Sequence, residues 1–501
     1  METRDLTQEP VLALGSIQSD LLLGHEKEAE ALVFFRIAHK ATFTHFIRHM
    51  SFTSSAAVYR PKDQQEAVAT GEVPPNPRYG VAFTFAGLKE LGVKGLESVD
   101  ETTPFVQGLA ARAVNVLNDA EPKQWVVGQP SQVLHGVFII TGATNADVEV
   151  GLHLHFTNHV HGFEVVSTLR GHVRPGDQKG HEHFGFMDGI SQPGIRGCVD
   201  AGHTTPLTVT HADAEPTQGL PGQDLLWPGE FVFGYPGQSE RDGDDLTVKG
   251  EIQKPPLPFM VNGAFLVIRR LEQLVPEMHA GSKAEARKHG VDPNLLEAQL
   301  VGRWPSGAPL LLSPTGDDPE LGKRDELNNK FEFEKDRLAK VCPWAAHIRK
   351  AYPRDEVPGN DAEELSDSEV APAEAFTQRH RMLRRGIQFG PELTAAEKKE
   401  NRTIEKRGLL FKCYITSIED QFEFVQRSWA NNPNFSQPKT ALHERSGIDA
   451  IIGQAPGGGE RELLGAGLEH DKPQMSFKPW VTMTGGGYFF APSLDFLRSV
   501  R

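Results

Sequence analysis

The chain has few cysteines and no long apolar segment, and each of these gaps excludes a class of protein. Its 501 residues include three cysteines, Cys198, Cys342 and Cys413. Three widely spaced thiols make neither a disulfide framework nor a C-x-x-C metal site, so we expect each to be a small buried side chain. No apolar run approaches the roughly 18 residues of a transmembrane helix. The sequence therefore predicts a protein without a membrane span.

Basic residues are also in deficit. Lys and Arg number 52 against 67 Asp and Glu, which gives a formal net charge of −15. A nucleic-acid or anionic-membrane partner would require a basic patch, so neither is expected. Residues 1–10 lack the basic start and the apolar centre of a secretion signal. The sequence as written is therefore expected to be intracellular, or secreted if its numbering starts after a removed leader.

Short runs of β-branched and aromatic residues recur along the chain. They predict buried strands, for example at 31–37, 136–140, 264–268 and 409–414. Segments with apolar residues at three- and four-residue spacing predict helices between the strands, such as 105–119 and 283–304. This mixture favours an α+β or α/β fold.

The length predicts two domains, because 501 residues are too many for one ordinary core. Residues 31–50 and 264–281 both read as a strand followed by a helix, which suggests two similar units. The proline-rich segment 253–258 is the predicted boundary. The expected domains are therefore residues 1–252 and 253–501.

Residues 355–374 hold eight acidic side chains and no Lys or Arg. This composition predicts an exposed loop. Clustered carboxylates also suit a hard cation, so a surface site for Mn²⁺ is the alternative.

A group of histidines suggests a metal site. His153 and His155 would share one face if they lay on a strand. His159 and His161, followed by Glu164, resemble a cupin motif with one residue too few before the Glu. A mononuclear metal site of a cupin-like oxygenase is one interpretation, and ordinary polar histidines are the other.

Two further segments carry more chemistry. Gly185–Pro193 (GFMDGISQP) places Asp188 between apolar neighbours in a loop punctuated by Gly and Pro. A carboxylate there either caps its own backbone or has a chemical use. Cys342–Lys350 (CPWAAHIRK) holds His347 in an otherwise apolar helical segment, where a lone His is usually a core residue.

Together these segments resemble the dye-decolorizing peroxidases, a family of haem enzymes, and further family-like segments run in the family's order from about residue 15 to 498. The resemblance implies that Asp188 handles the protons of hydrogen peroxide on the distal side of the haem. It implies that His347 is the proximal iron ligand, with Asp449 accepting a hydrogen bond from it. In Met382–Gly390 (MLRRGIQFG), Arg384 rather than Arg385 matches the distal arginine.

Other positions follow from the same resemblance. Leu409 and Phe411 match an apolar distal pair, and Arg349 would suit a haem propionate. Phe389 stands where members can carry a radical-forming Tyr, whereas Trp429 matches a second relay position and also fits a core role. Ser19 replaces the usual Gly near the start.

The implied fold is α+β, with two ferredoxin-like domains, each an antiparallel β-sheet with peripheral helices. Haem b would lie in a cavity mainly of the C-terminal domain. Asp188 would act as general base and then acid, and Arg384 would stabilise the developing negative charge. The reducing partners would be dyes of the anthraquinone type, phenols and Mn²⁺. The alternative within haem proteins is a non-catalytic carrier, which would need His347 but not Asp188 and Arg384 together.

Overall fold

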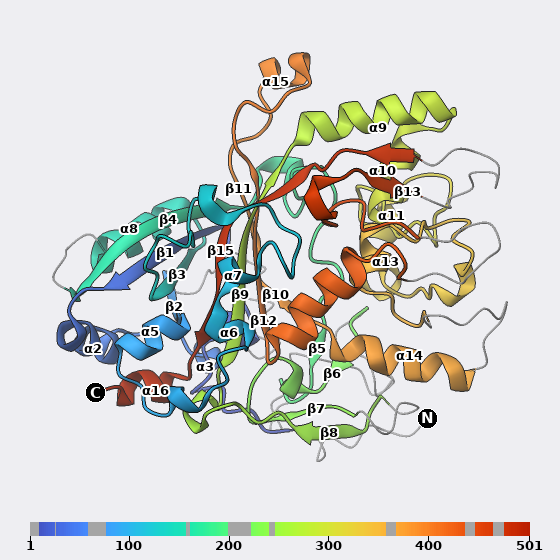
Figure 1. Ribbon diagram of the computed structural model, residues 1–501. Helices are drawn as coiled ribbons and strands as arrows, with labels where there is room; N and C mark the ends of the chain where they lie inside the picture. Colours follow the sequence, from blue (N-terminus) through green and yellow to red (C-terminus); the bar gives the residue numbers. More distant parts are fainter. Residues whose placement is uncertain are drawn as a thin grey trace.

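The fold was analysed in a computed structural model that describes residues 10–25, 27–58, 77–156, 161–198, 222–239, 246–356, 367–435, 446–463 and 475–501. A central antiparallel sheet runs through the molecule, with helices on its outside (Figure 1). All three cysteines are buried, as the sequence predicted. No helix within the described ranges is long and apolar enough to span a bilayer.

The N-terminal half forms a βαββαβ unit. Its elements are β1 (Ala29–Ile37), α2 (Lys40–His49), β2 (Arg78–Phe83), β3 (Gly136–Gly142), α8 (Asn145–Phe156) and β4 (Phe163–His172). The strand order is β2-β3-β1-β4, with every pair antiparallel. Shorter elements connect these, namely α1 (Ser19–Leu22), α3 (Ser55–Val58), α5 (Phe85–Glu90), α6 (Pro104–Gln107) and α7 (Leu109–Arg112).

The C-terminal half repeats this order. Its elements are β9 (Ala264–Gln273), α9 (Val275–His289), β10 (Leu383–Arg384), β11 (Ile387–Phe389), β12 (Gly408–Ile415), the π-helical turns η9 (Ile418–Glu423) and η10 (Val425–Ala430), and β15 (Val481–Ala491). The strands lie in the order β10-β12-β9-β15, and β11 pairs with β12. Each half is thus ferredoxin-like, which confirms the predicted fold class. The boundary at residues 252 and 253 stays a prediction.

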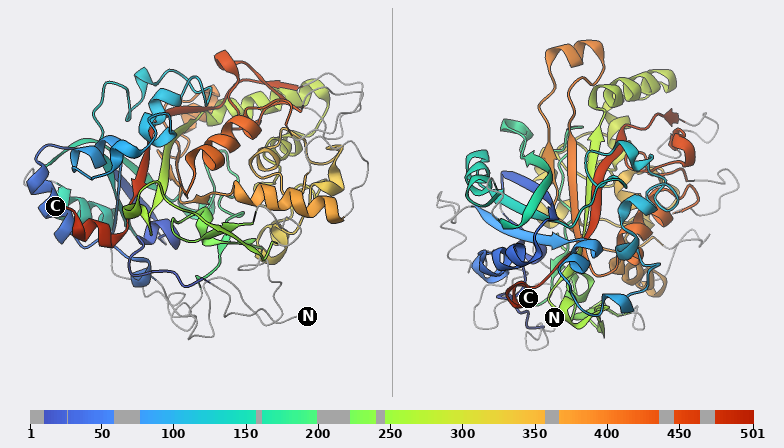
Figure 2. Two further views of the ribbon diagram at one scale, coloured as in Figure 1. Left: turned by 60° about the horizontal axis from the view of Figure 1, so that its bottom comes forward. Right: turned by 60° about the vertical axis from the view of Figure 1, so that its left-hand side comes forward.

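The two sheets join and curl into a barrel. β15 pairs with β2 through Phe490 and Phe83, so the strands of both halves lie side by side (Figure 2). At the opposite edges β11 packs against β4. A Cβ atom on Gly171 of β4 would lie only 2.4 Å from Cγ2 of Ile387 in β11, so glycine permits this close approach.

Alternating side chains serve two cores, as the two-residue period of a strand requires. Leu32 and Phe34 of β1 face one core, which also contains Leu266 of β9. Strands from both halves contribute one of their faces to this core. Val33 and Phe35 face the covering helices. The predicted strands are continuous apolar runs because both of their faces are buried.

Long insertions on one side of the barrel carry most of the remaining elements. They include β5 (Gly194–Ile195), β6 (Leu225–Leu226), β7 (Pro236–Gln238), β8 (Lys249–Ile252), α10 (Pro293–Val301), α11 (Pro319–Gly322), α12 (Asp325–Asn328), α13 (His347–Ala351), α14 (Asp367–Arg379), β13 (Arg461–Leu463) and β14 (Met475–Phe477). Two helices lie elsewhere: α15 (Ala395–Glu400) projects at the top of Figure 1, and α16 (Leu494–Ser499) follows β15 and packs against α2. Most of the elements between β9 and β10 lie to the right of the sheet in Figure 1.

Two predicted helices are each divided by a glycine. Gly108 has φ +76° and separates α6 from α7, although 105–119 was predicted as one helix. Gly290, at φ +68°, ends α9, and α10 starts three residues later behind the cap of Asp292. At Gly290 the left-handed conformation, which costs glycine no steric clash, lets its N–H close the last turn on the carbonyls of Ala286 and Arg287.

The expectation that His153 and His155 share a strand face was wrong. Both lie on helix α8, where residues two apart point in different directions. Thr144 and Asp147 exchange hydrogen bonds at the start of this helix and fix it there. Within the described ranges no group of three His, Cys, Asp or Glu side chains could hold a metal ion, and His159 lies outside those ranges.

Candidate active site

The loop that carries Asp188 is held by the half-buried carboxylate of Glu182. Glu182 accepts the backbone N–H groups of Phe184 and Phe186 at 2.8 and 2.9 Å. Burial raises the pKa of Glu182, and these hydrogen bonds counteract part of that rise. The Asp188 N–H donates to the carbonyl of Gly180 at 2.9 Å. The loop is therefore fixed up to and including the backbone of Asp188.

Asp188 itself is partly open to solvent. Its Oδ1 accepts the N–H of Gly189 at 2.6 Å, so the capping role considered from the sequence is present. The side chain keeps 34% of its surface exposed. Oδ1 therefore caps the backbone of the turn, while the carboxylate stays accessible to solvent.

Arg384 supplies the cation beside this carboxylate. Its Nη1 lies 3.6 Å from Oδ1 of Asp188, and 31% of its side chain is exposed. Arg385, by contrast, donates to the carbonyls of Asp20 and Leu22. Of the two neighbouring arginines, Arg384 is thus the one that meets Asp188.

His347 opens helix α13 and pairs with a buried acid. Its Nδ1 lies 2.8 Å from Oδ2 of Asp449, which has no exposed surface. The other carboxylate oxygen accepts the N–H groups of Ile451 and Ile452 at 2.8 and 2.9 Å. The Asp449 N–H donates to Ala430 in η10, which packs against α13. Both partners are therefore held rigidly.

The electrostatics of this pair fix the proton. Burial lowers the pKa of His347, but the Asp449 carboxylate outweighs it and the net pKa is raised. Burial raises the pKa of Asp449, yet the imidazole and the two N–H groups bring it below its usual value. Nδ1 therefore carries a proton toward Asp449, and Nε2 is the nitrogen left for an external ligand.

The three segments belong to one site. Arg384 and Asp188 both act electrostatically on the pKa of His347, in opposite directions. Arg384 is the register partner of Cys413 in β12, and directly opposed residues of an antiparallel pair point to the same face. Leu409 and Phe411 share that face by their two-residue spacing. Both are partly exposed, whereas Leu410 between them is buried.

Arg349, which the resemblance suggested for a haem propionate, is engaged within the protein. Its fully buried guanidinium donates to Glu356 at 2.7 Å and to the carbonyls of Cys342 and Asp336 at 2.7 and 3.0 Å. Its donors are thus engaged within the protein, and a structural role fits them. Two residues along a helix lie on nearly opposite sides, so Arg349 points away from His347.

Two other arginines, which the sequence reasoning missed, gather around one amide. Arg303 donates to Oδ1 of Asn329 at 2.6 Å, and Arg354 donates to the same oxygen at 3.1 Å. Burial, with the charges of Arg354 and Arg384, lowers the pKa of Arg303 to about 9. Among the described residues neither Arg303 nor Arg354 forms a salt bridge. Such a site suits a carboxylate ligand, but only the folded chain reveals it, because the residues are distant in sequence.

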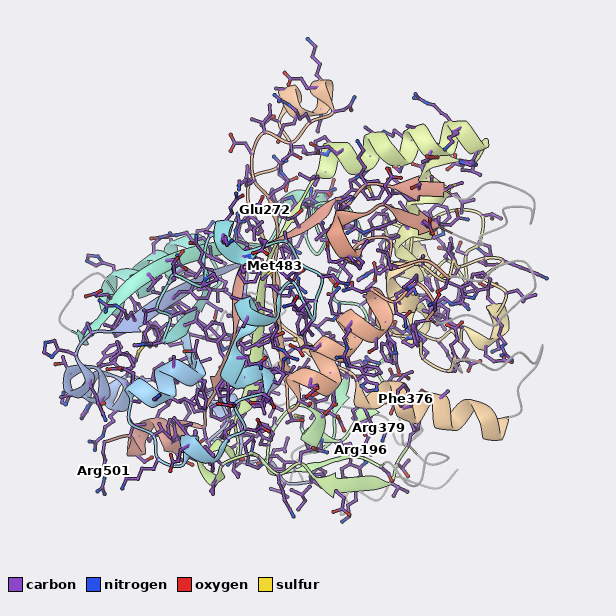
Figure 3. The ribbon with its side chains drawn as sticks, in the orientation of Figure 1. Arg196, Glu272, Phe376, Arg379, Met483 and Arg501 are labelled. Carbon is purple, nitrogen blue, oxygen red and sulfur yellow. The ribbon has the colours of Figure 1, made fainter. Side chains whose placement is uncertain are left out.

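Trp429 lies in an aromatic cluster behind His347. It is 2% exposed and stacks on Phe435 at a centroid distance of 5.3 Å. Phe376 of α14, labelled in Figure 3, meets its ring edge-on at 6.4 Å. The indole therefore has the core role that the sequence allowed, on the η10 turn that packs against α13.

The acidic segment begins differently from the expected exposed loop. Asp355 and Glu356 are buried, because Asp355 accepts the N–H groups of Phe333 and Glu334 and Glu356 pairs with Arg349. Residues from Asp367 onward form α14. Residues 357–366 lie outside the described ranges. The Mn²⁺ site stays a prediction.

The fold and these residues define an α+β barrel protein with an acid-paired histidine and an Asp–Arg pair. The family model described as "DyP dimeric alpha+beta barrel domain" matches residues 16–175. Dye-decolorizing peroxidase msp1 of Mycetinis scorodonius is 33% identical over 98% of this chain and 88% of its own length. Dye-decolorizing peroxidase AauDyP1 of Auricularia auricula-judae is 32% identical over 96% of this chain and 85% of its own length.

Solved structures agree. An ancestral D-type dye-decolorizing peroxidase superposes with a TM-score of 0.78 at 34% identity, covering 98% of this chain and 99% of that one. A dye-decolorizing peroxidase in complex with 2,6-dimethoxyphenol has a TM-score of 0.75 at 30% identity, covering 98% and 99%. The chain belongs to the dye-decolorizing peroxidase family. It is a peroxidase of a haem-dependent family, which excludes the carrier and cupin alternatives.

Proposed function

We propose that the chain holds haem b between His347 on one side and Asp188 with Arg384 on the other, and uses it to reduce hydrogen peroxide. The observation that carries this proposal is the hydrogen bond of 2.8 Å between His347 and Asp449, beside an Asp–Arg pair separated by 3.6 Å. An imidazole oriented by a buried carboxylate is a typical ligand arrangement for haem iron.

The donor set fits the whole cofactor. Nε2 of His347 is available for iron because Nδ1 is bound to Asp449. Arg303 and Arg354, which meet at Asn329, suit the two propionate carboxylates. Leu409 and Phe411 supply apolar surface on the face that Arg384 shares. When bound, the haem would supply an iron site for peroxide and store the oxidising equivalents taken from it.

The protein's own groups would move the proton and stabilise charge. The Asp188 carboxylate would accept the proton from one peroxide oxygen and deliver it to the other, as general base and then acid. The Arg384 guanidinium would stabilise the negative charge that develops as the O–O bond breaks. Asp188 and Arg384 are close enough to act on one small molecule, and both stay partly exposed.

Dyes and phenols are the proposed electron donors. The relatives are named for dye decolorization, and one was solved with 2,6-dimethoxyphenol. Bulky donors would deliver electrons through Trp429, whose turn packs against the His347 helix. Oxidation of Mn²⁺ through the acidic segment is a separate proposal, to be tested by peroxide-dependent formation of Mn³⁺.

The test is a pair of histidine variants compared by absorption spectroscopy after haem loading. We expect His347→Ala to lose the Soret absorbance of the wild type or to shift it, and to lose peroxide turnover. His279→Ala, near the start of α9 and 31% exposed, should change neither. A normal spectrum in His347→Ala would contradict the assignment.

A further inference from the structure

Gln192 joins the loop of Asp188 to the backbone of Arg384. Its Nε2 donates to the Arg384 carbonyl at 2.8 Å, and the Arg384 N–H points back to its Oε1 at 3.3 Å. Gln192 follows Asp188 by four residues in the same loop. One side chain thus connects the proposed acid–base residue to the residue that carries the proposed cation.

The location of Arg384 explains why this connection has consequences. β10 consists of two residues and is the last strand of its sheet, paired only with β12. An edge strand leaves one row of N–H and C=O groups without a partner strand. The Gln192 amide takes the place of that strand, with one donor and one acceptor at the spacing of a peptide group.

Other contacts hold the loop to different parts of the molecule. Asn329 donates to the carbonyl of Ile190 at 2.9 Å and accepts the hydroxyl of Ser191 at 2.8 Å. Arg381 donates to the Ser191 carbonyl at 3.1 Å. These bonds fix the loop against Asn329 of the insertion and against Arg381, three residues before Arg384, but none of them contacts Arg384 itself.

We propose that Gln192 is a positioning residue that sets the separation of Asp188 and Arg384. The proposal rests on the peroxidase roles assigned above to these two residues. Both side chains are about one third exposed and lie 3.6 Å apart, so no direct hydrogen bond keeps them together. Without the amide, the N–H and C=O of Arg384 would lose their partner on the side away from β12, and the guanidinium would drift from the loop.

The chain contains a matched control. Gln18 makes the same pair of bonds with one strand residue, because its Nε2 donates to the Val81 carbonyl and its Oε1 accepts the Val81 N–H, both at 2.9 Å. Val81 lies in β2, in the N-terminal unit. Gln18→Ala therefore removes the same pair of bonds, and a third bond to the Pro492 carbonyl, from residues with no proposed role in the reaction.

The experiment compares Gln192→Ala, Gln18→Ala and wild type after haem loading. We expect Gln192→Ala to slow the reaction with peroxide by roughly 10- to 100-fold, the scale on which a misplaced group acts, with the KM for a small phenol unchanged. Gln18→Ala should lower Tm and leave the peroxide rate unchanged. In hydrogen exchange of the full chain, Gln192→Ala should expose the amide of Arg384 more than wild type.

A double-mutant cycle with Arg384→Leu separates positioning from general damage. If Gln192 acts through Arg384, adding Gln192→Ala to Arg384→Leu should change the peroxide rate less than twofold. Full additivity of the two losses, or an equal loss in Gln18→Ala, would overturn the proposal. If the Gln192→Ala variant reacted at the wild-type rate while the Arg384→Leu variant was impaired, only the positioning role of Gln192 would be refuted. A wild-type rate in Arg384→Leu would refute the catalytic role and the positioning role together.

Discussion

Nδ1 of His347 lies 2.8 Å from Oδ2 of Asp449, a residue 102 positions further along the chain. This hydrogen bond ties the first residue of α13 to a loop that is anchored on η10 through the Asp449 N–H. His347 is therefore held through its backbone in α13 and through Nδ1 of its ring, so that Nε2 points in a defined direction.

Replacing Asp449 by Asn should raise the reduction potential of the bound haem. A neutral partner makes the imidazole a weaker electron donor to iron. The amide oxygen can still accept the N–H groups of Ile451 and Ile452, so the loop should be preserved. Spectroelectrochemical titration measures the effect, and a potential equal to that of the wild type would count against the role of Asp449.

Removing the guanidinium of Arg384 should impair the peroxide step. We expect Arg384→Leu to slow it by about 10²- to 10³-fold, the usual loss for one preorganised donor. Arg384→Lys keeps the charge without the forked geometry and should fall between Leu and wild type. Stopped-flow spectroscopy gives the rates. If the Lys and Leu variants reacted equally slowly, the positive charge of Arg384 would not be the source of its effect.

Trp429→Phe should reduce the oxidation of bulky dyes and spare small phenols. The indole is buried on η10 and cannot meet a dye directly, so its loss would interrupt a route rather than a binding surface. Trp480→Phe, another buried tryptophan, is the control for packing damage. Steady-state rates with both substrate sizes check this, and an equal loss on the two would indicate a packing defect.

Stability should fall as the pH rises from about 4.5 to about 7 because of Glu374. Burial and the nearby Asp224 and Asp355 raise the pKa of this carboxyl from 4.5 to about 7. The folded chain binds more protons than the unfolded one in that window, so deprotonation favours unfolding. Glu374→Gln should flatten this part of the pH dependence. Denaturant unfolding at several pH values measures it, and an unchanged slope would exclude Glu374 as its source.

The sequence predicted the sheet better than the ends of its helices. Continuous β-branched and aromatic runs, such as 31–37 and 264–268, became strands because both of their faces are buried. The helix expected at 283–304 failed at Gly290, where the apolar period continues across a left-handed turn. A periodic pattern reports which face is buried, and it does not report where the backbone turns.

The site was predictable as a set of segments and unpredictable as a set of contacts. His347, Asp449, Asp188 and Arg384 could be assigned because each lies in a short motif. The ion pair of Arg349 could not be foreseen, since the spacing from His347 says nothing of the carboxylate of Glu356 that holds it. The contacts of Asn329 and Gln192 join segments more than a hundred residues apart, and no local pattern signals them.

The central claim is that Asp188 moves the proton of hydrogen peroxide at a haem bound by His347. The most direct test is the stopped-flow rate of Asp188→Asn with peroxide, in protein whose haem spectrum matches the wild type. The substitution keeps the size of the side chain and the oxygen that accepts the Gly189 N–H. We predict a rate lower by about 10²- to 10⁴-fold, the usual loss of a positioned acid–base group. A wild-type rate would contradict the account.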